Sequence, residues 1–149
     1  MTAPLILVLA GGTGGHVYPA LAVAQELVAR GYRVEWVGTR RGLEERVVPA
    51  AGFMLHRLPV RGLRGKSVMD SLAFWLVLRR APGCVVGMGG YASGPVGLMS
   101  RLLRRPLILH EQNAVAGTTN RLLAPLASAC LGGFPDAFSA HRRGTFVGN

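Results

Sequence analysis

Short apolar runs alternate along the chain with segments in which apolar residues recur every three or four positions. Unbroken apolar runs predict strands buried on both faces, and the wider spacing predicts helices packed on a sheet. Strands are expected at 5–9, 33–38, 53–58, 84–86, 107–109, 128–131 and 144–147. Helices are expected after Pro19 as far as Gly31, at 43–48 where Pro49 stops the helix, at 67–80 with Ser67 as N-cap, at 95–103 and at 118–126.

This alternation predicts an α/β fold, a doubly wound parallel sheet with helices on both faces. A chain of 149 residues is long enough for one such domain. Three segments directly follow predicted strands: a first glycine loop at 11–16, a second glycine loop at 87–94, and the polar segment 110–113. Because ligands bind beyond the carboxyl ends of parallel strands, these segments are expected to line one rim together.

The chain is strongly basic, with 17 Lys and Arg against 7 Asp and Glu and a net charge of +10. Sixteen of the cations are arginine, and Lys66 is the single lysine. Such a balance favours nucleic acid, an anionic membrane or a phosphorylated ligand as partner. A genomic bias toward arginine explains the same excess, so charge alone does not choose among these partners.

The compartment is expected to be the cytoplasm. Cys84 and Cys130 lie in apolar runs without CxxC spacing, which indicates reduced core residues. The first residues lack the basic region of a signal peptide. No apolar run reaches the roughly 18 residues of a membrane span, and the longest candidate, Val68 to Leu78, is interrupted by Asp70.

The first glycine loop indicates an anion site. Glycines at a strand–helix junction let backbone approach a ligand, and the helix start offers free N–H groups. His16 is the one titratable side chain in this loop. It is either a general base, in the neutral form that a helix N-terminus favours, or a contact to backbone or phosphate.

Other motifs give weaker indications. Gly62 to Ser67 ends like a phosphate-binding P-loop, but Val60 stands where that motif needs glycine. Residues 87–92 fit a loose GxGxxA dinucleotide pattern, with Glu111 at a suitable distance to hold a ribose. The aspartates are only Asp70 and Asp136, so no DxD pair is present to hold a metal ion, and no metal or other cofactor is expected.

The segment after the fifth predicted strand adds polar groups to the rim. Glu111 is the only carboxylate expected at the rim, and it is either a rival base or a ligand of a sugar hydroxyl. Asn113 either binds a sugar or an acetamide or caps a turn. His110 is expected to hold a loop.

A further stretch combines apolar and basic residues: Phe74, Trp75, Leu76, Arg79 and Arg80. It is either a core-facing helix with a basic end or a membrane-surface patch.

Four motifs occur in order along the chain: Gly11-Gly12-Thr13-Gly14-Gly15-His16-Val17; Gly62-Leu63-Arg64-Gly65-Lys66; Gly87-Met88-Gly89-Gly90-Tyr91 with Ser93-Gly94-Pro95; and His110-Glu111-Gln112-Asn113 with Gly117 and Thr119-Asn120. Together with the final Val147-Gly148-Asn149, they resemble the MurG family of peptidoglycan glycosyltransferases. The resemblance runs the whole length.

The resemblance implies a GT-B glycosyltransferase of family 28, in which two Rossmann-like domains face a cleft. Residues 1–149 correspond to the N-terminal, acceptor-binding domain, without the C-terminal donor-binding domain. The implied reaction is an inverting, metal-independent transfer of N-acetylglucosamine from UDP-GlcNAc to undecaprenyl-pyrophosphoryl-MurNAc-pentapeptide (lipid I), which makes lipid II for cell-wall growth, shape and division. The acceptor domain alone is expected to be inactive.

The resemblance also implies roles for individual residues. The catalytic candidates are His16 and Glu111. The implied contacts to the edge of UDP-GlcNAc are Thr13, Gly14, Gly15 and Asn113. The implied contacts to the acceptor pyrophosphate are Gly12, His16, Gly89, Gly90, Tyr91 and Ser93.

The resemblance implies a peripheral location on the cytoplasmic face of the bacterial cell membrane. The anionic surface of that membrane is an expected partner, and nucleic acid is not an expected partner. Two other hypotheses stay open. The chain is alternatively a membrane-anchoring, non-catalytic subunit of a split glycosyltransferase, which the reading frame beyond Asn149 distinguishes. A dinucleotide-binding domain is the third.

Overall fold

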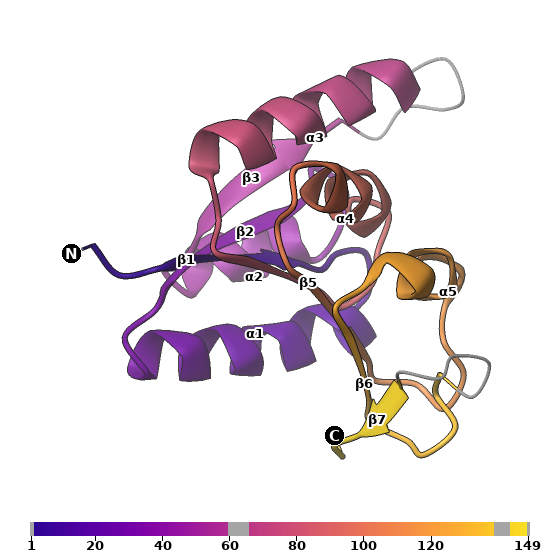
Figure 1. Cartoon of the computed structure of the whole chain (residues 1–149). Helices are drawn as coiled ribbons and strands as arrows, with labels where there is room; N and C mark the ends of the chain where they lie inside the picture. The colour runs from indigo at the N-terminus through magenta and orange to yellow at the C-terminus, as the bar shows by residue number, and fades with distance from the viewer. Residues whose placement is uncertain (1, 60–65, 139–143, 149) are drawn as a thin grey trace.

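A computed structural model describes residues 2–59, 66–138 and 144–148, and its described elements form one parallel sheet of seven strands in the order β3-β2-β1-β4-β5-β6-β7 (Figure 1). The strands are β1 (Leu5–Leu9), β2 (Arg33–Thr39), β3 (Met54–Leu58), β4 (Cys84–Gly87), β5 (Leu107–Glu111), β6 (Ala129–Gly132) and β7 (Gly144–Phe146). The helices are α1 (Gly14–Ala29), α2 (Glu44–Ala50), α3 (Lys66–Arg80), α4 (Ser93–Leu102), α5 (Thr118–Leu123) and the 3-10 turn η2 (Ala124–Leu126).

The sheet has two separate layers of core packing, one on each face. Helices α1 and α2 cover one face, and α3, α4 and α5 cover the other (Figure 1). The central strand β1 supplies both layers, because successive side chains in a strand point to opposite faces. Leu5, Leu7 and Leu9 join the α3–α5 layer, whereas Ile6 and Val8 join the α1–α2 layer. The predicted doubly wound α/β fold is confirmed.

The strand order reverses between the neighbours β1 and β4. After β1 the chain enters α1 on one face, and after β4 it enters α4 on the other. The chain therefore leaves these two strands toward opposite faces of the sheet. Ligands bind at such a point, beyond the carboxyl ends of the strands, in open α/β sheets. Both glycine loops lie at this switch point.

The predicted element ends were wrong at several places. Helix α1 begins at Gly14, inside the first glycine loop, and it accommodates Pro19 in its second turn. Helix α2 runs on to Ala50, so it includes Pro49, which was expected to stop it. Helix α3 begins at Lys66, one residue before the expected cap Ser67. Helix α4 begins at Ser93 and not at Pro95, which takes an early position in the first turn.

Some expectations fall on residues that the structure does not describe. Residues 60–65 include most of the Gly62-to-Lys66 motif, and Asn149 ends the last motif. The side chains of Lys66 and Ser67 also lie outside the described part.

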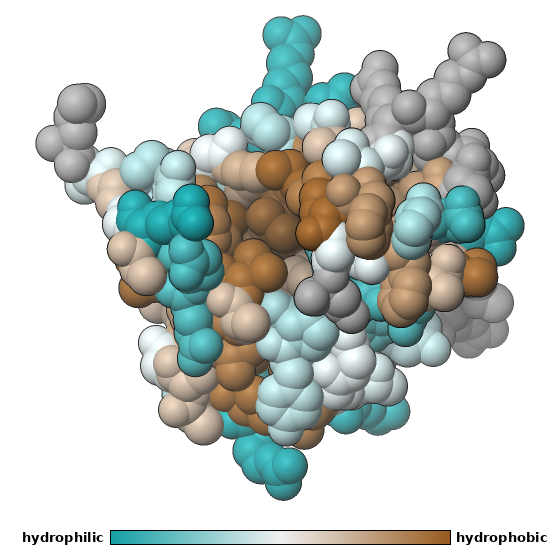
Figure 2. Space-filling model, turned by 90° about the horizontal axis from the view of Figure 1, so that it is seen from below, coloured by the Kyte–Doolittle hydropathy of each residue, from teal (hydrophilic) through white to brown (hydrophobic). Residues whose placement is uncertain are grey.

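The face that carries α1 leaves apolar surface exposed. In the view from below, brown apolar surface lies between hydrophilic side chains (Figure 2). A groove of about 810 Å³ runs there between α1 and the first residues of β1, and Cys84 and Ile108 line its far side. None of the described helices has the length and apolar character needed to cross a bilayer.

Candidate functional site

A cavity of about 330 Å³ lies at the carboxyl ends of β1, β4 and β5, and we call it the glycine cavity. It brings together the two glycine loops and the segment that follows β5, as the sequence predicted. Its lining residues are Gly11, Gly12, Thr13, His16, Gly89, Gly90, Tyr91, Glu111, Gly117, Thr118, Thr119 and Asn120.

The two glycine loops touch each other, and this contact requires glycine at positions 89 and 90 of the second loop. Gly89 and Gly90 have φ angles of +105° and +100°, a region that other residues rarely adopt. A Cβ on Gly90 would lie 2.7 Å from the carbonyl oxygen of Gly11, and a Cβ on Gly89 would lie 2.7 Å from the ring of His16. The second loop therefore forms a wall directly against His16.

Ser93 holds the second loop from behind. Its hydroxyl lies 2.9 Å from the carbonyl oxygen of Gly89 and 3.3 Å from that of Leu9, and the residue is fully buried. Ser93 therefore does not line the cavity, although the resemblance implied a contact to pyrophosphate. Tyr91, by contrast, lies at the cavity with 77% of its surface exposed.

His16 belongs to a chain of polar side chains. Its Nδ1 lies 3.3 Å from Oε1 of Gln112, while Nε2 of Gln112 lies 3.1 Å from Nδ1 of His110 and 3.3 Å from its carbonyl oxygen. Because a carbonyl oxygen can only accept, the Gln112 amide presents Nε2 to His110 and Oε1 to His16. With this amide orientation, Nδ1 of His16 is the donor to Gln112, and in the neutral imidazole Nε2 carries the lone pair.

His110 ends this chain as an acceptor. Burial lowers the pKa of His110 below its ordinary value, and the nearby Glu111 charge and a hydrogen bond that the ring donates to the Gly148 backbone oppose that shift only in part. A neutral imidazole can accept the Gln112 amide at Nδ1. His110 thus holds the loop, as expected from the sequence.

Glu111 is enclosed by donors. Oε1 accepts from the backbone N–H and the side-chain amide of Asn113, at 3.0 and 2.8 Å. Oε2 accepts from the N–H of Gly117 at 3.0 Å and from the amide of Asn120 at 2.9 Å. Burial raises the pKa of Glu111, but these four hydrogen bonds outweigh it and hold the pKa below its ordinary value. The carboxylate is therefore fully occupied in shaping the loop from Asn113 to Asn120.

The structure also separates some residues that the sequence grouped. Thr13 lines the cavity, whereas Gly14 and Gly15 form the first turn of α1 beside it. Their N–H groups have no carbonyl one turn earlier in the helix to bond to. Asn113 is exposed beyond the cavity lining and donates to Glu111.

Two residues of the site were missed. Gln112 belongs to the fourth motif, but nothing in the sequence showed that its side chain links His16 to His110. Glu44 was not singled out, and the expectation that Glu111 is the only carboxylate at this rim was wrong. Glu44 begins α2, 32 positions from Gly12, and accepts the N–H of Gly12 at 2.9 Å. Only the fold brings them together.

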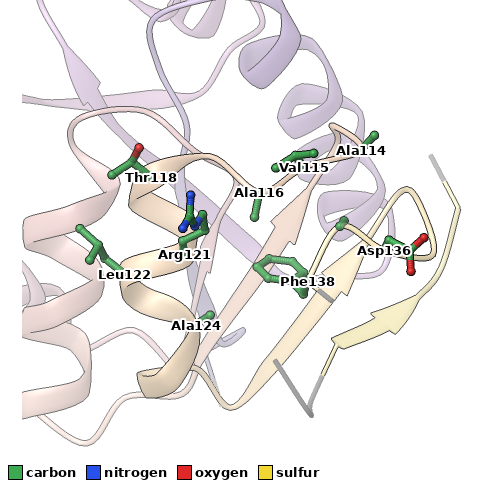
Figure 3. A pocket seen from close by; sticks show the side chains of 10 residues that line it. Ala114, Val115, Ala116, Thr118, Arg121, Leu122, Ala124, Asp136 and Phe138 are labelled. Atoms are coloured by element: carbon green, nitrogen blue, oxygen red, sulfur yellow. The ribbon is translucent and has the colours of Figure 1, made fainter. Parts of the chain in front are cut away.

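A second hollow, of about 690 Å³, lies beside α5 (Figure 3). Arg121 and Leu122 line it from α5, and Phe138 and Asp136 line it from the segment after β6. Thr118 lines both this hollow and the glycine cavity. None of the site residues that the sequence predicted lines this hollow.

The residues expected to form a membrane patch on α3 do not all face outward. Trp75 is 56% exposed, but Leu76 packs against the core. Arg80 donates to both carboxylate oxygens of the buried Glu35, while Arg79 is exposed. The exposed apolar residues of α3 are Val68, Leu72, Trp75 and Leu78.

Within the described ranges, no three His, Cys, Asp or Glu side chains lie close enough together to share one metal ion.

A doubly wound sheet with two glycine loops in contact across its switch point defines a class: the Rossmann-like α/β domains that bind phosphate-containing ligands. The model of the glycosyltransferase family 28 N-terminal domain matches residues 6–131. The chain belongs to this family of glycosyltransferases.

Two relatives with the same name match nearly the whole chain. A UDP-N-acetylglucosamine–N-acetylmuramyl-(pentapeptide) pyrophosphoryl-undecaprenol N-acetylglucosamine transferase of Stutzerimonas stutzeri is 50% identical, over 97% of this chain and 44% of its own length. The protein of that name from Pseudomonas fluorescens is 51% identical with the same coverage.

Solved structures agree with this result. The crystal structure of MurG from Acinetobacter baumannii superimposes with a TM-score of 0.88 at 35% identity, covering 97% of this chain and 45% of that one. The chain thus spans less than half the length of these relatives.

Proposed function

We propose that this chain is the acceptor-binding domain of a transferase that moves N-acetylglucosamine from UDP-GlcNAc to undecaprenyl-pyrophosphoryl-MurNAc-pentapeptide. The observation that carries the proposal is the glycine cavity, in which two glycine loops and the Glu111 segment meet around His16. The names of relatives about 50% identical over nearly the whole chain supply the substrates.

In this proposal, His16 is the general base. The Gln112 contact fixes a proton on Nδ1, so Nε2 is free to take the proton of the MurNAc 4-hydroxyl as that oxygen attacks the anomeric carbon. The bond from that carbon to the UDP oxygen breaks, UDP leaves, and the configuration inverts. No metal ion takes part in this reaction.

Glu111 is assigned a positioning role rather than that of the base. Its two oxygens already accept four hydrogen bonds and its pKa is lowered, so it binds a proton weakly. Asn113, placed by Glu111, is left at the outer edge of the site, where we assign it to the donor together with Thr13, Gly14 and Gly15.

The acceptor pyrophosphate is assigned to the glycine cavity. Gly12, Gly89, Gly90, Tyr91 and His16 line it, and the N-terminus of α1 supplies N–H groups and positive dipole. The exposed side of α3, with Trp75 and Arg79, is assigned to the anionic cytoplasmic face of the membrane. The remaining donor contacts are assigned to a C-terminal domain outside these 149 residues.

A fusion tests the proposal. Residues 1–149 are joined to the second half of Acinetobacter baumannii MurG, and UDP release is measured with UDP-GlcNAc and a lipid I analogue. Release that requires the acceptor supports the proposal. A folded fusion that releases no UDP above a fusion carrying His16→Ala contradicts it, and the split-subunit alternative then gains support if the chain still binds vesicles.

A further inference from the structure

Glu44 is a buried carboxylate that the proposed reaction does not use. It is 0% exposed at the start of α2, behind the first glycine loop. Among the described residues, none forms an ion pair with it; the described ion pairs of glutamates involve Glu26, Glu35 and Glu45. A buried carboxylate without a cation is costly unless hydrogen bonds replace its water.

Three donors supply those hydrogen bonds. Oε1 accepts from the backbone N–H of Thr39 at 2.8 Å and from its hydroxyl at 2.9 Å. Oε2 accepts from the N–H of Gly12 at 2.9 Å. The carboxylate therefore bridges the carboxyl end of β2 to the loop that follows β1.

Three glycines make room for this side chain. A Cβ on Gly11 would lie 2.5 Å from Oε1 of Glu44, and a Cβ on Gly38 would lie 2.5 Å from its Cγ. A Cβ on Gly42 would overlap the carboxylate itself. The backbone on all sides is thus shaped to hold this one carboxylate.

The Gly12 peptide is held at both ends by the same short segment. While its N–H donates to Glu44, its carbonyl accepts from the N–H of Leu43 at 3.2 Å. Gly12 has φ +93°, so the loop makes its sharp turn at this point. Thr13 then occupies the N-cap position of α1, and Gly14, Gly15 and His16 follow directly in the first turn.

We infer that Glu44 is a positioning residue: it fixes Gly12 and thereby aims the start of α1 and His16 at a diphosphate in the glycine cavity, without touching it. Since Gly12 N–H is taken by Glu44, the anion is bound through the N-terminus of α1 and the second glycine loop. The inference deepens the proposed function and rests on it for the identity of the anion.

The test compares Glu44→Gln with Glu45→Gln in the 149-residue chain labelled with nitrogen-15. The glutamine amide presents an N–H₂ group toward one of the donors, so Gly12 or Thr39 loses its acceptor. Glu45 is the matched control, because it is the neighbouring residue of α2 and pairs with Arg57 at the surface. The probe is inorganic pyrophosphate, followed through the amide resonances of Gly14 and Gly15.

The expected result for Glu44→Gln has two parts. The amide resonances of Gly12, Gly14, Gly15 and His16 move in the free protein. The Kd for pyrophosphate rises about 10-fold or more, because the N–H groups at the start of α1 are no longer aimed at the anion and a charge-assisted hydrogen bond to it is weakened. Glu45→Gln leaves both unchanged. A folded Glu44→Gln chain with unchanged pyrophosphate affinity, although the Gly12 resonance moves, overturns the inference.

Other outcomes are also decisive. If Glu44→Gln does not fold, Glu44→Asp is measured instead, since its shorter side chain cannot reach both Thr39 and Gly12. If neither folds, Glu44 serves the core alone and the inference fails. If the unaltered chain does not bind pyrophosphate, the anion assignment of the proposed function fails. Glu44 is then judged on the Gly14, Gly15 and His16 resonances, which must move in Glu44→Gln and not in Glu45→Gln.

Discussion

At the scale of single residues, the site depends on hydrogen bonds that give similar side chains different tasks. His16 and His110 both contact Gln112, yet His16 faces its carbonyl oxygen and His110 faces its amide nitrogen. Glu111 and Glu44 are both fully buried carboxylates, and each is surrounded by backbone N–H donors. His16 bonds to Gln112 and Glu44 bonds to Gly12, both far away in the sequence, so these two roles depend on where the chain returns. Glu111, by contrast, bonds to the loop that directly follows it.

Replacing His16 with alanine in the fusion protein removes the proposed base. We expect kcat to fall by roughly 10²- to 10⁴-fold, the usual contribution of a general base, with a much smaller change in KM for UDP-GlcNAc. Steady-state kinetics of UDP release measure both values. His56→Ala is the control, because His56 pairs with Glu35 on β2, away from the cavity. A rise in KM with kcat unchanged would make His16 a binding residue.

Glu111→Gln is expected to destabilise the domain by about 1–3 kcal/mol at neutral pH, because a buried carboxylate oxygen is replaced by a donor facing other donors. The pKa of Glu111 is lower in the folded chain than its ordinary value of 4.5. Its stabilisation is therefore complete above pH 4.5 and is lost as the pH falls through the folded pKa.

Urea unfolding of both proteins between pH 3 and pH 7 measures this difference. The gap in the free energy of unfolding should narrow below pH 4.5. A gap that stays constant over the whole range would mean that the ionised form of Glu111 has no part in it.

At the scale of elements, the glycine loops are held from several directions, whereas α3 packs on the core through one side only. The loops are held by contacts from several strands and helices, including the 2.8 Å hydrogen bond from Trp36 to the carbonyl oxygen of Ala10. Helix α3 packs on the sheet through Ala73 and Val77 and leaves Trp75 outside. The pairing of Arg80 with Glu35 fixes the end of α3, and this orientation presents its exposed apolar side.

Trp75→Glu is expected to reduce binding to vesicles that contain anionic phospholipid by about five-fold or more, because an exposed aromatic is replaced by a charge that the lipid surface repels. Co-sedimentation measures the bound fraction. Val28→Glu is the control, since Val28 is a similarly exposed apolar residue on α1, on the other face of the sheet. Equal losses in both variants would show that α3 is not the docking face.

At the scale of the whole molecule, the described strands form one seven-stranded sheet with two core layers, and the chain matches only 44% of the length of its relatives. The glycine cavity opens at the rim of the sheet rather than inside it. A transfer reaction needs both substrates held in one geometry, which an open rim on a single domain cannot provide.

We therefore expect the chain alone to release no UDP above background when it is given UDP-GlcNAc and a lipid I analogue. A coupled assay for UDP measures this, and the fusion protein described above is the positive control. Release by the chain alone that depends on His16 would show that the proposed second domain is not needed for chemistry.

The sequence by itself determined the class of fold. Residues 5–9 and 107–109 are all apolar, so each segment predicts a strand buried on both faces. The carboxyl ends of parallel strands lie on one rim of the sheet. The motifs around His16, Gly89 and Glu111 likewise indicated one shared site, because each follows a strand.

Tertiary structure alone decided what the polar residues do. Gly12, two residues before the start of α1, bonds to Glu44 and Leu43, residues that no local pattern connects to it. Ser93 is turned inward because the carbonyl oxygen of Leu9, on β1, accepts from its hydroxyl. Glu111 is turned inward because the loop from Asn113 to Asn120 folds back over it and supplies donors. Hydrogen bonds between segments depend on the packed positions of whole elements, and spacing along the chain does not contain that information.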